Sequence, residues 1–191
     1  MFMLRRFIAV GLLLGSSVTL ADTLDINLSN SAAQFKYGVP SGIAGKSSLF
    51  ASLLYNDAND VLVDGGLLVL NEEGGVPGLS LGIGAKVVAA SLNKVAPSRK
   101  FVSGVALGAQ VRFEIPTDRR FAVIGEYHYA PGIISFGGAD NFSQSAIRGE
   151  FAISPLTQAY IGYRESRFKL ANGLPDGKLD SGVHIGVRLA F

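Results

Sequence analysis

A two-residue periodicity runs through long stretches of this chain and limits its fold more than any other feature. In residues 101–115 the odd positions are apolar except for Ser103. The even positions include Gly104, Gly108, Gln110, Arg112 and Glu114. Such alternation is typical of a β-strand whose two faces meet different surroundings. The stretch exceeds the usual globular strand of about five or six residues, and its length suits a tilted strand that crosses hydrocarbon, which needs about 9–11 residues.

The same reasoning divides the chain into about ten strands. We expect them near residues 23–29, 32–39, 47–56, 60–70, 78–90, 101–115, 120–130, 142–153, 158–168 and 181–191. Eight strands is the alternative count. Toward the C-terminus the connections alternate between short turns, at 116–119 and 154–157, and long loops, at 91–100, 131–141 and 169–180. This alternation is typical of outer-membrane barrels, with short periplasmic turns and long outer loops.

The first 21 residues have the order of a secretory signal peptide. Arg5 and Arg6 precede the apolar run 7–14, which is too short to span a bilayer, and small residues follow it up to Ala21. We therefore expect residues 1–21 to be cleaved and residues 22–191 to form one domain; a buried N-terminal helix is the alternative. Removal of the signal leaves 15 basic and 15 acidic residues. This balance argues against nucleic acid as a partner.

An exported chain with long two-faced strands must pair its backbone groups internally if it enters a membrane. In hydrocarbon only helices and closed barrels achieve this pairing. The sequence therefore predicts an all-β fold, a transmembrane antiparallel up-and-down β-barrel in the outer membrane of a Gram-negative bacterium. We expect a monomer surrounded by outer-membrane lipid. The chain has no cysteine, and we expect no metal and no cofactor.

The last strand ends in an unusual way. Val187, Leu189 and Phe191 lie on its outward face, and Phe191 is the final residue. This ending resembles the C-terminal signal by which the barrel-assembly machinery recognises outer-membrane barrels. The alternative is an ordinary edge strand that happens to end in phenylalanine.

Two segments resemble a known family. The segment GEYHYAPGI, residues 125–133, and the segment SPLTQAYIGYRESRF, residues 154–168, are similar to the YfaZ family of small bacterial outer-membrane proteins. The resemblance covers about the last two-thirds of the chain. It implies an outer-membrane barrel and carries no established activity.

The inner face of the predicted barrel is rich in charge. We expect a lumen charge network made by Arg112, Glu114, Glu126, Arg148, Glu150, Arg164 and Arg188. Counting from the short turns places Arg112, Glu126, Glu150 and Arg164 at a similar depth, in the half nearer the periplasm. We expect the long side chains to cross the lumen toward the glycine-rich inner wall of strands 78–90 and 101–115. A barrel of eight to ten strands is about wide enough for side chains to fill.

These features predict a non-enzymatic barrel with a filled lumen and a structural or membrane-integrity role. One alternative is a narrow, porin-like passive conduit for small solutes. Another is a lipid-modifying enzyme at the outer mouth, in which His128 would act with Ser143, Ser145 or Glu126. Against this enzyme, the His-x-Ser spacing of lipid-A deacylases is missing, because Tyr129 and Ala130 follow His128.

Overall fold

The computed structural model describes residues 22–191 except 44–45, 72–75, 94–99 and 172. The predicted signal peptide, residues 1–21, lies outside the described residues. The described part contains eleven strands and one short 3-10 helix. These are β1 (Thr23–Ser29), β2 (Ala32–Ser41), β3 (Lys46–Asn56), β4 (Val61–Asn71), β5 (Leu79–Leu92), β6 (Lys100–Glu114), β7 (Phe121–Ala130), η1 (Gly132–Ile134), β8 (Ser135–Phe136), β9 (Ala139–Ser154), β10 (Thr157–Leu170) and β11 (Gly177–Ala190).

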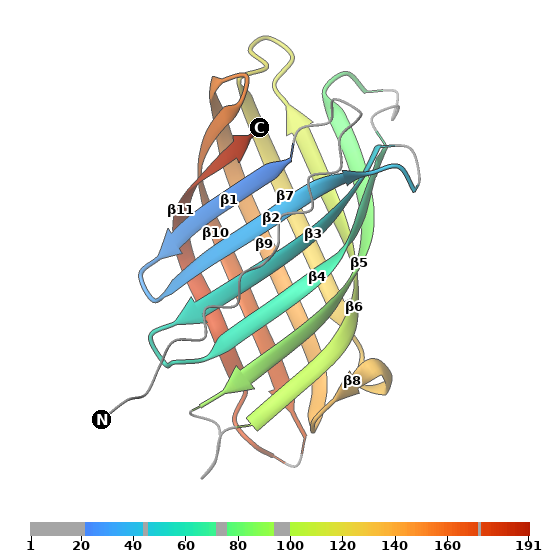
Figure 1. The fold of residues 1–191 in the computed structure, drawn as a ribbon, viewed down its shortest axis with the longest axis vertical. Helices are drawn as coiled ribbons and strands as arrows, with labels where there is room; N and C mark the ends of the chain where they lie inside the picture. The colour runs from blue at the N-terminus through green and yellow to red at the C-terminus, as the bar shows by residue number, and fades with distance from the viewer. Residues whose placement is uncertain (1–21, 44–45, 72–75, 94–99, 172) are drawn as a thin grey trace, which may run out of the picture.

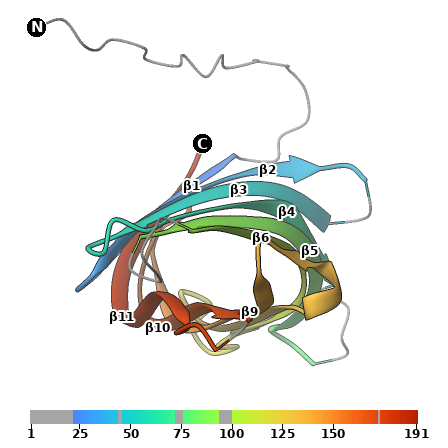
Figure 2. The same cartoon turned by 90° about the horizontal axis from the view of Figure 1, so that it is seen from below.

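Ten of these strands close into a barrel (Figure 1). Each pairs antiparallel with the next along the chain, with β7 followed by β9, and β1 pairs with β11. The remaining strand, β8, is only two residues long and pairs with β6 at Ser103 and Gly104. Seen from below, the strands form a ring (Figure 2). The predicted antiparallel up-and-down barrel of ten strands is confirmed, and every predicted segment corresponds to one barrel strand.

The two ends of the barrel differ. We call the end with Asp22 and Phe191 the turn end; it also holds the connections 42–45, 72–78, 115–120 and 155–156. The opposite end, here the loop end, holds the connections 30–31, 57–60, 93–99, 131–138 and 171–176. In the C-terminal half the shortest connection, residues 155–156, lies at the turn end and the longest, residues 131–138, lies at the loop end, as the sequence predicts. In the N-terminal half the shortest connection, residues 30–31, lies at the loop end.

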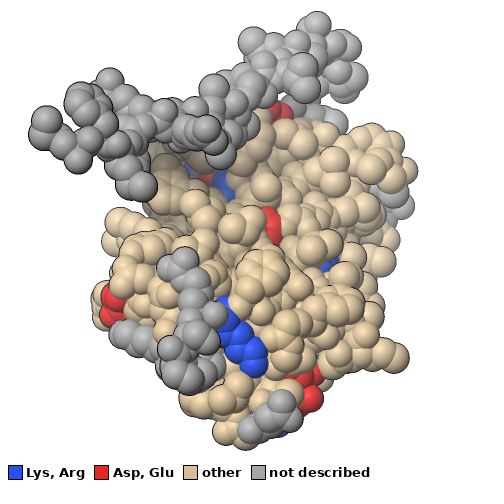
Figure 3. Space-filling model, turned by 60° about the horizontal axis from the view of Figure 1, so that its bottom comes forward, with Lys and Arg blue, Asp and Glu red and all other residues tan. Residues whose placement is uncertain are grey.

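The outer surface of the barrel is apolar along the strands. Alternation on β6 leaves Leu107 62% exposed while its neighbour Ala106 is fully buried. The same contrast separates Ile185 from His184 on β11. In the space-filling view of one face, charged atoms are few among the uncharged residues (Figure 3). No helix in the described part of the chain is long and apolar enough to cross a membrane.

The interior changes character along the barrel. Toward the loop end a cluster of buried apolar side chains fills it, and we call this cluster the apolar plug. Its largest members are Leu54, Leu62, Val88, Leu92, Val102, Phe142, Phe168 and Leu179. The rings of Phe142 and Phe168 pack with their centroids 4.7 Å apart, across the β9–β10 pair. Most of the charged interior side chains lie between this plug and the turn end.

Candidate functional site

The charged and polar residues of the interior form two groups, and the members of each group are joined by hydrogen bonds or ion pairs. The first, here the arginine cluster, consists of Asp25, Arg112, Glu114, Glu126, Arg148, Glu150 and Arg188. The second, here the polar belt, consists of Asn27, Gln34, Ser52, Asp64, Lys86, Gln144, Arg164 and Asp180. Each residue is held on the inner face by the alternation of its strand.

Glu150 is the centre of the arginine cluster. Its carboxylate accepts hydrogen bonds from Arg112 Nη1 at 2.6 Å and from Arg148 Nε at 2.9 Å, and Arg188 Nη1 lies 3.1 Å away. Arg112 reaches Glu150 across β7, where the small Ala122 is the inward residue opposite Glu150. Glu150 is only 3% exposed, and three guanidinium groups offset the cost of burying its charge.

Each of these arginines also meets a second carboxylate. Arg112 Nε donates to Glu114 Oε1 at 3.2 Å, and Arg148 Nη2 lies 3.4 Å from Glu126 Oε1. Arg188 Nη2 donates to Asp25 Oδ2 at 3.1 Å, across the β1–β11 pair. The cluster is therefore a network of alternating charges and not a set of isolated ion pairs.

A tyrosine also contacts the arginine cluster. Tyr160 on β10 donates a hydrogen bond to Asp25 on β1, with β11 between them. The β11 residue opposite Tyr160 is Gly186. A Cβ at Gly186 would lie 2.4 Å from the Tyr160 ring and its hydroxyl oxygen, so only glycine leaves room for the ring to cross. The Arg148 guanidinium also lies 5.2 Å from the centroid of the Tyr160 ring, within the range of a cation–π contact.

The polar belt begins at Arg164, which is 3% exposed. Its Nη2 atom donates to Asp180 Oδ2 at 2.5 Å, and its Nη1 atom donates to Asn27 Oδ1 at 3.0 Å. Gln34 accepts from both Arg164 and Asn27. Arg164 thus connects β10 and β11 to β1 and β2 through the lumen.

The belt continues around the wall through β3, β4 and β5. Gln34 Nε2 donates to Ser52 Oγ at 3.4 Å, and Ser52 Oγ donates to Asp64 Oδ2 at 2.7 Å. Lys86 Nζ lies 3.6 Å from Asp64 Oδ1 and also donates to Gln144 on the opposite wall. The belt therefore closes across the interior, next to the apolar plug.

The structure places the seven residues of the predicted network on the inner face but divides them. Six of them lie in the arginine cluster. The seventh, Arg164, contacts Asp180, Asn27 and Gln34 of the polar belt, and no ion pair joins it to the other six within the described residues. Counting residues from the turns misses this division, because strands in a barrel are tilted and staggered against one another.

The expected route of the long side chains across the lumen is wrong. The atoms nearest to a Cβ built at Gly82 belong to Leu70, Leu68 and Gln110, and those nearest to Gly108 belong mainly to the His128 ring. Side chains of the neighbouring strands therefore cover the glycine wall. The arginines and glutamates extend instead along the wall formed by β6, β7, β9, β11 and β1.

Several charged lumen residues are absent from the predicted network. They are Asp25, Lys36, Asp64, Lys86 and Asp180. The first four follow the same alternation on predicted strands, so the signal was present in the sequence. Asp180 continues the alternation of His184 and Arg188 but lies one residue before the predicted strand 181–191, and the β-bulge between β10 and β11 buries Leu179 beside it.

The charges in the lumen balance. Leaving aside the first residues of β3 and β6, the described strands carry six acidic and six basic residues on the inner face. The acidic residues are Asp25, Asp64, Glu114, Glu126, Glu150 and Asp180, and the basic ones are Lys36, Lys86, Arg112, Arg148, Arg164 and Arg188. A neutral interior of this kind suits mutual pairing more than selection of one sign of ion.

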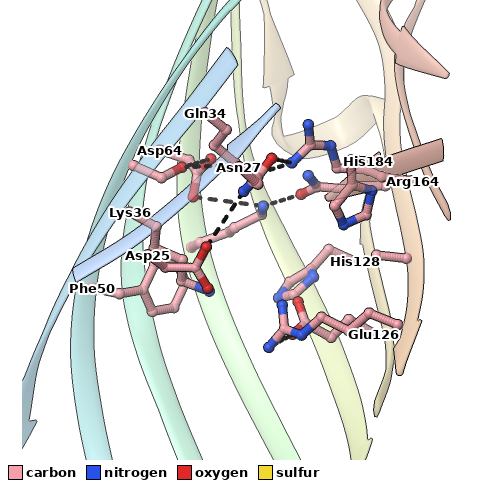
Figure 4. A pocket seen from close by; sticks show the side chains of 15 residues that line it. Asp25, Asn27, Gln34, Lys36, Phe50, Asp64, Glu126, His128, Arg164 and His184 are labelled. Atoms are coloured by element: carbon pink, nitrogen blue, oxygen red, sulfur yellow. Dashed lines mark hydrogen bonds and ion pairs between the residues drawn. The ribbon is translucent and has the colours of Figure 1, made fainter. Parts of the chain in front are cut away.

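A polar cavity of about 40 Å³ lies between the two groups (Figure 4). Lys36 and Asp25 face it from one wall, and Glu126, His128 and His184 face it from the other. The buried His184 Nδ1 atom has no hydrogen-bond partner among the described residues. This volume has room for a few water molecules, which would satisfy such an atom.

Of the predicted enzyme alternative, His128 and Glu126 face the same cavity, but the two serines do not join them. His128 is directly opposite Gln144 in the β7–β9 register. Ser143 and Ser145 are the immediate neighbours of Gln144 along β9, so their side chains point to the outer face while His128 points inward. Among the described residues, no three or more His, Asp or Glu side chains group as metal ligands would.

The C-terminal strand completes the ring. Val187, Leu189 and Phe191 are exposed on the outer face. Phe191 N donates to Asp22 O at 3.0 Å, and Asp22 N donates to Phe191 O at 2.9 Å. The final residue therefore pairs with the first described residue at the turn end.

The fold and the outer face define a closed antiparallel β-barrel with apolar side chains exposed along its strands. The chain belongs to the YfaZ family, because the sequence model of that family, described as YfaZ precursor, matches residues 3–191. This confirms the resemblance of the two segments quoted above. A comparison with curated proteins finds no match.

Three solved structures are similar in part. The outer membrane channel DcaP of Acinetobacter baumannii is 13% identical, with 87% of this chain and 54% of that chain covered and a TM-score of 0.46. This chain thus spans about half the length of DcaP. The KdgM porin is 7% identical, with 90% and 99% covered and a TM-score of 0.45. The NanC porin is 13% identical, with the same coverages and a TM-score of 0.48.

Proposed function

We propose that this protein is a small, monomeric outer-membrane β-barrel with a closed lumen, and that it serves a structural or membrane-integrity role. The outer surface supports residence in lipid, since its strands present apolar side chains outward along most of their length. The barrel stands with its termini and turn end in the periplasm and its loop end outside. No catalytic step is assigned to it.

The filled interior carries this proposal. The apolar plug occupies the loop end with side chains such as Phe142 and Phe168, both fully buried. Behind it, the polar belt crosses the interior by hydrogen bonds, and the arginine cluster covers one wall with buried ion pairs. A solute would have to separate the two rings and then break buried ion pairs, and breaking one such pair typically costs about 3–5 kcal/mol.

Single-channel recording in planar bilayers tests the proposal. The wild-type barrel is expected to give no steady conductance. Exchange of both plug rings, Phe142→Ala with Phe168→Ala, removes the apolar seal and is expected to produce current steps or frequent flickering. The matched control is Phe121→Ala with Phe151→Ala. The centroids of these two rings also lie close together, at 4.9 Å, but on the outer face. The control is expected to behave as the wild type.

Two outcomes would contradict the proposal. Steady, reproducible conductance steps from the wild-type barrel would favour the narrow passive conduit, for which the polar cavity would be the natural path. A silent plug variant that is folded would show that the phenylalanine pair is not the seal.

The terminal strand supports a second part of the proposal. We assign Val187, Leu189 and Phe191 to recognition by the barrel-assembly machinery. All three are exposed, and they contribute little to the packing of the lumen. Their loss is therefore expected to slow assembly more than it destabilises the assembled barrel.

A further inference from the structure

Charged side chains on the outer face of the barrel are confined to one place. By alternation, the outward positions within β1 to β7 carry no charged side chain in the described residues. On β10 the outward face carries Glu165, Arg167 and Lys169, and on β11 it carries Lys178, all toward the loop end. Because lipid-facing strands elsewhere exclude charge, this grouping needs an explanation of its own.

The basic residues of this group stand directly beside one another. Arg167 is paired with Lys178 across the β10–β11 register, and Lys169 is the next outward residue on β10. Like charges opposite each other on a sheet destabilise the pair. Arg167 has a partner in Glu165, with 3.3 Å between Nη2 and Oε1. Lys169 and Lys178 make no ion pair within the part of the chain that the structure describes. The group therefore carries a net positive charge that the described protein does not offset.

Its position along the barrel matches the headgroup layer of a membrane. On β10 the outward residues from Ala159 through Ile161 to Tyr163 are apolar or aromatic, and those of β11 are apolar at Val183 and Ile185. Tyrosine is typical of the membrane–water interface. Arg167 follows Tyr163 by four residues, about 13 Å along a strand. Because a strand tilted near 45° rises less along the membrane normal, Arg167 lies about 9 Å higher than Tyr163 in that direction. Long basic side chains at this height reach headgroup phosphates.

We propose that Arg167, Lys169 and Lys178 form a binding site for the phosphate groups of an anionic lipid in the leaflet at the loop end. The guanidinium group supplies a planar pair of donors for phosphate oxygens, and the two ammonium groups supply further charge. A bound phosphate removes the repulsion between Arg167 and Lys178. This site rests on the proposed orientation, with the loop end outside, and is independent of whether the lumen conducts.

The test measures lipid retained by the purified barrel in nanodiscs, using diphosphoryl lipid A and the same lipid freed of its phosphates. The wild type is expected to retain the phosphorylated lipid in clear preference. The variant Lys169→Gln/Lys178→Gln is expected to lose about tenfold or more of this retention, since each basic residue adds to the attraction of anionic lipid. The control Arg119→Gln/Arg120→Gln removes the same charge from exposed residues at the turn end and is expected to retain the lipid.

Three results would overturn the site. One is that the Lys169→Gln/Lys178→Gln variant retains as much lipid as the wild type, and another is that the wild type retains the dephosphorylated lipid equally well. The third is that inorganic phosphate at millimolar levels in detergent abolishes lipid retention, because this result would assign the basic group to a free anion. Conductance recorded on the same samples separates the two proposals. Current through the wild type would refute the closed lumen and leave the lipid site intact.

Discussion

Replacement of Glu150 by glutamine is the sharpest test of the arginine cluster. This change removes one negative charge from a balanced interior and leaves the shape of the side chain almost unchanged. Arg112, Arg148 and Arg188 all lie within 3.1 Å of the Glu150 carboxylate. A glutamine oxygen can still accept about two hydrogen bonds, but its amide group would face the third guanidinium and repel it.

The expected loss follows from the contacts. Hydrogen bonds to charged groups contribute about 1.5–3 kcal/mol each, and at least one of the three is lost. None of the arginines is left without a carboxylate, because Glu114, Glu126 and Asp25 pair with them. We therefore expect a decrease of about 3 kcal/mol in the free energy of unfolding, at the lower edge of the range for breaking a buried pair.

The assay is urea unfolding of the barrel in detergent or vesicles. Circular dichroism and gel mobility are suitable probes, since the chain has no tryptophan. The matched control is Glu114→Gln. The Glu114 side chain is 37% exposed and its one ion pair is with Arg112 at 3.2 Å, so its loss is expected to cost less than about 1 kcal/mol. Adding Arg112→Gln to Glu150→Gln restores equal charge in the lumen and is expected to recover part of the stability.

The reasoning would be refuted by either of two results. One is an unfolding midpoint for Glu150→Gln that matches the wild type at an unchanged m-value. The other is an equal loss for Glu114→Gln, which would show that burial has no bearing on the cost. Either result would mean that water screens the cluster.

Three further predictions concern other parts of the molecule. Gly186→Ala is expected to lower the urea midpoint of unfolding clearly, because the added Cβ would lie 2.4 Å from the Tyr160 ring. The control Gly149→Ala places its Cβ in open space and is expected to change the midpoint little. Equal midpoints for the two variants would show that the Tyr160 ring moves freely. Deletion of Phe191 is expected to reduce the rate of insertion by the assembly machinery in reconstituted vesicles while the urea midpoint of the assembled barrel changes little; an unchanged rate would remove the proposed signal. The intact mass of the protein isolated from membranes is expected to be that of a chain that begins at Asp22. A mass that includes the first 21 residues would contradict cleavage.

The class of fold and most of its strands could be predicted from the residue pattern. The reason is that alternation is a local property: in a strand, residues two apart share a face, so residues 101–115 reveal both faces without knowledge of any partner. Long strands and the requirement to pair every backbone group in hydrocarbon then leave the closed barrel. For the same reason the inward direction of Arg112, Glu150 and Arg188 could be read directly.

Which inward residues meet depends on the folded barrel and could not be predicted from the residue pattern. Strand tilt and stagger set the depth of each side chain, and these depend on the register between strands that are far apart in the sequence. Arg164 therefore pairs with Asp180 and reaches Asn27, although its distance from the nearest turn predicts a place beside Glu150. The bulge that buries Leu179 beside Asp180 is a property of the β10–β11 pair and not of either strand alone.

The apolar cluster at the loop end could likewise not be predicted from the sequence, which indicated only that charged side chains fill the lumen. Phe142 and Phe168 lie 26 residues apart and meet because the β9–β10 register places them directly opposite each other. The local pattern assigns a side chain to the inside, but the neighbours that it finds there depend on how the sheet closes. The local pattern therefore specified a barrel with a charged interior, and the closure of the sheet specified which charges pair and where apolar rings fill the lumen.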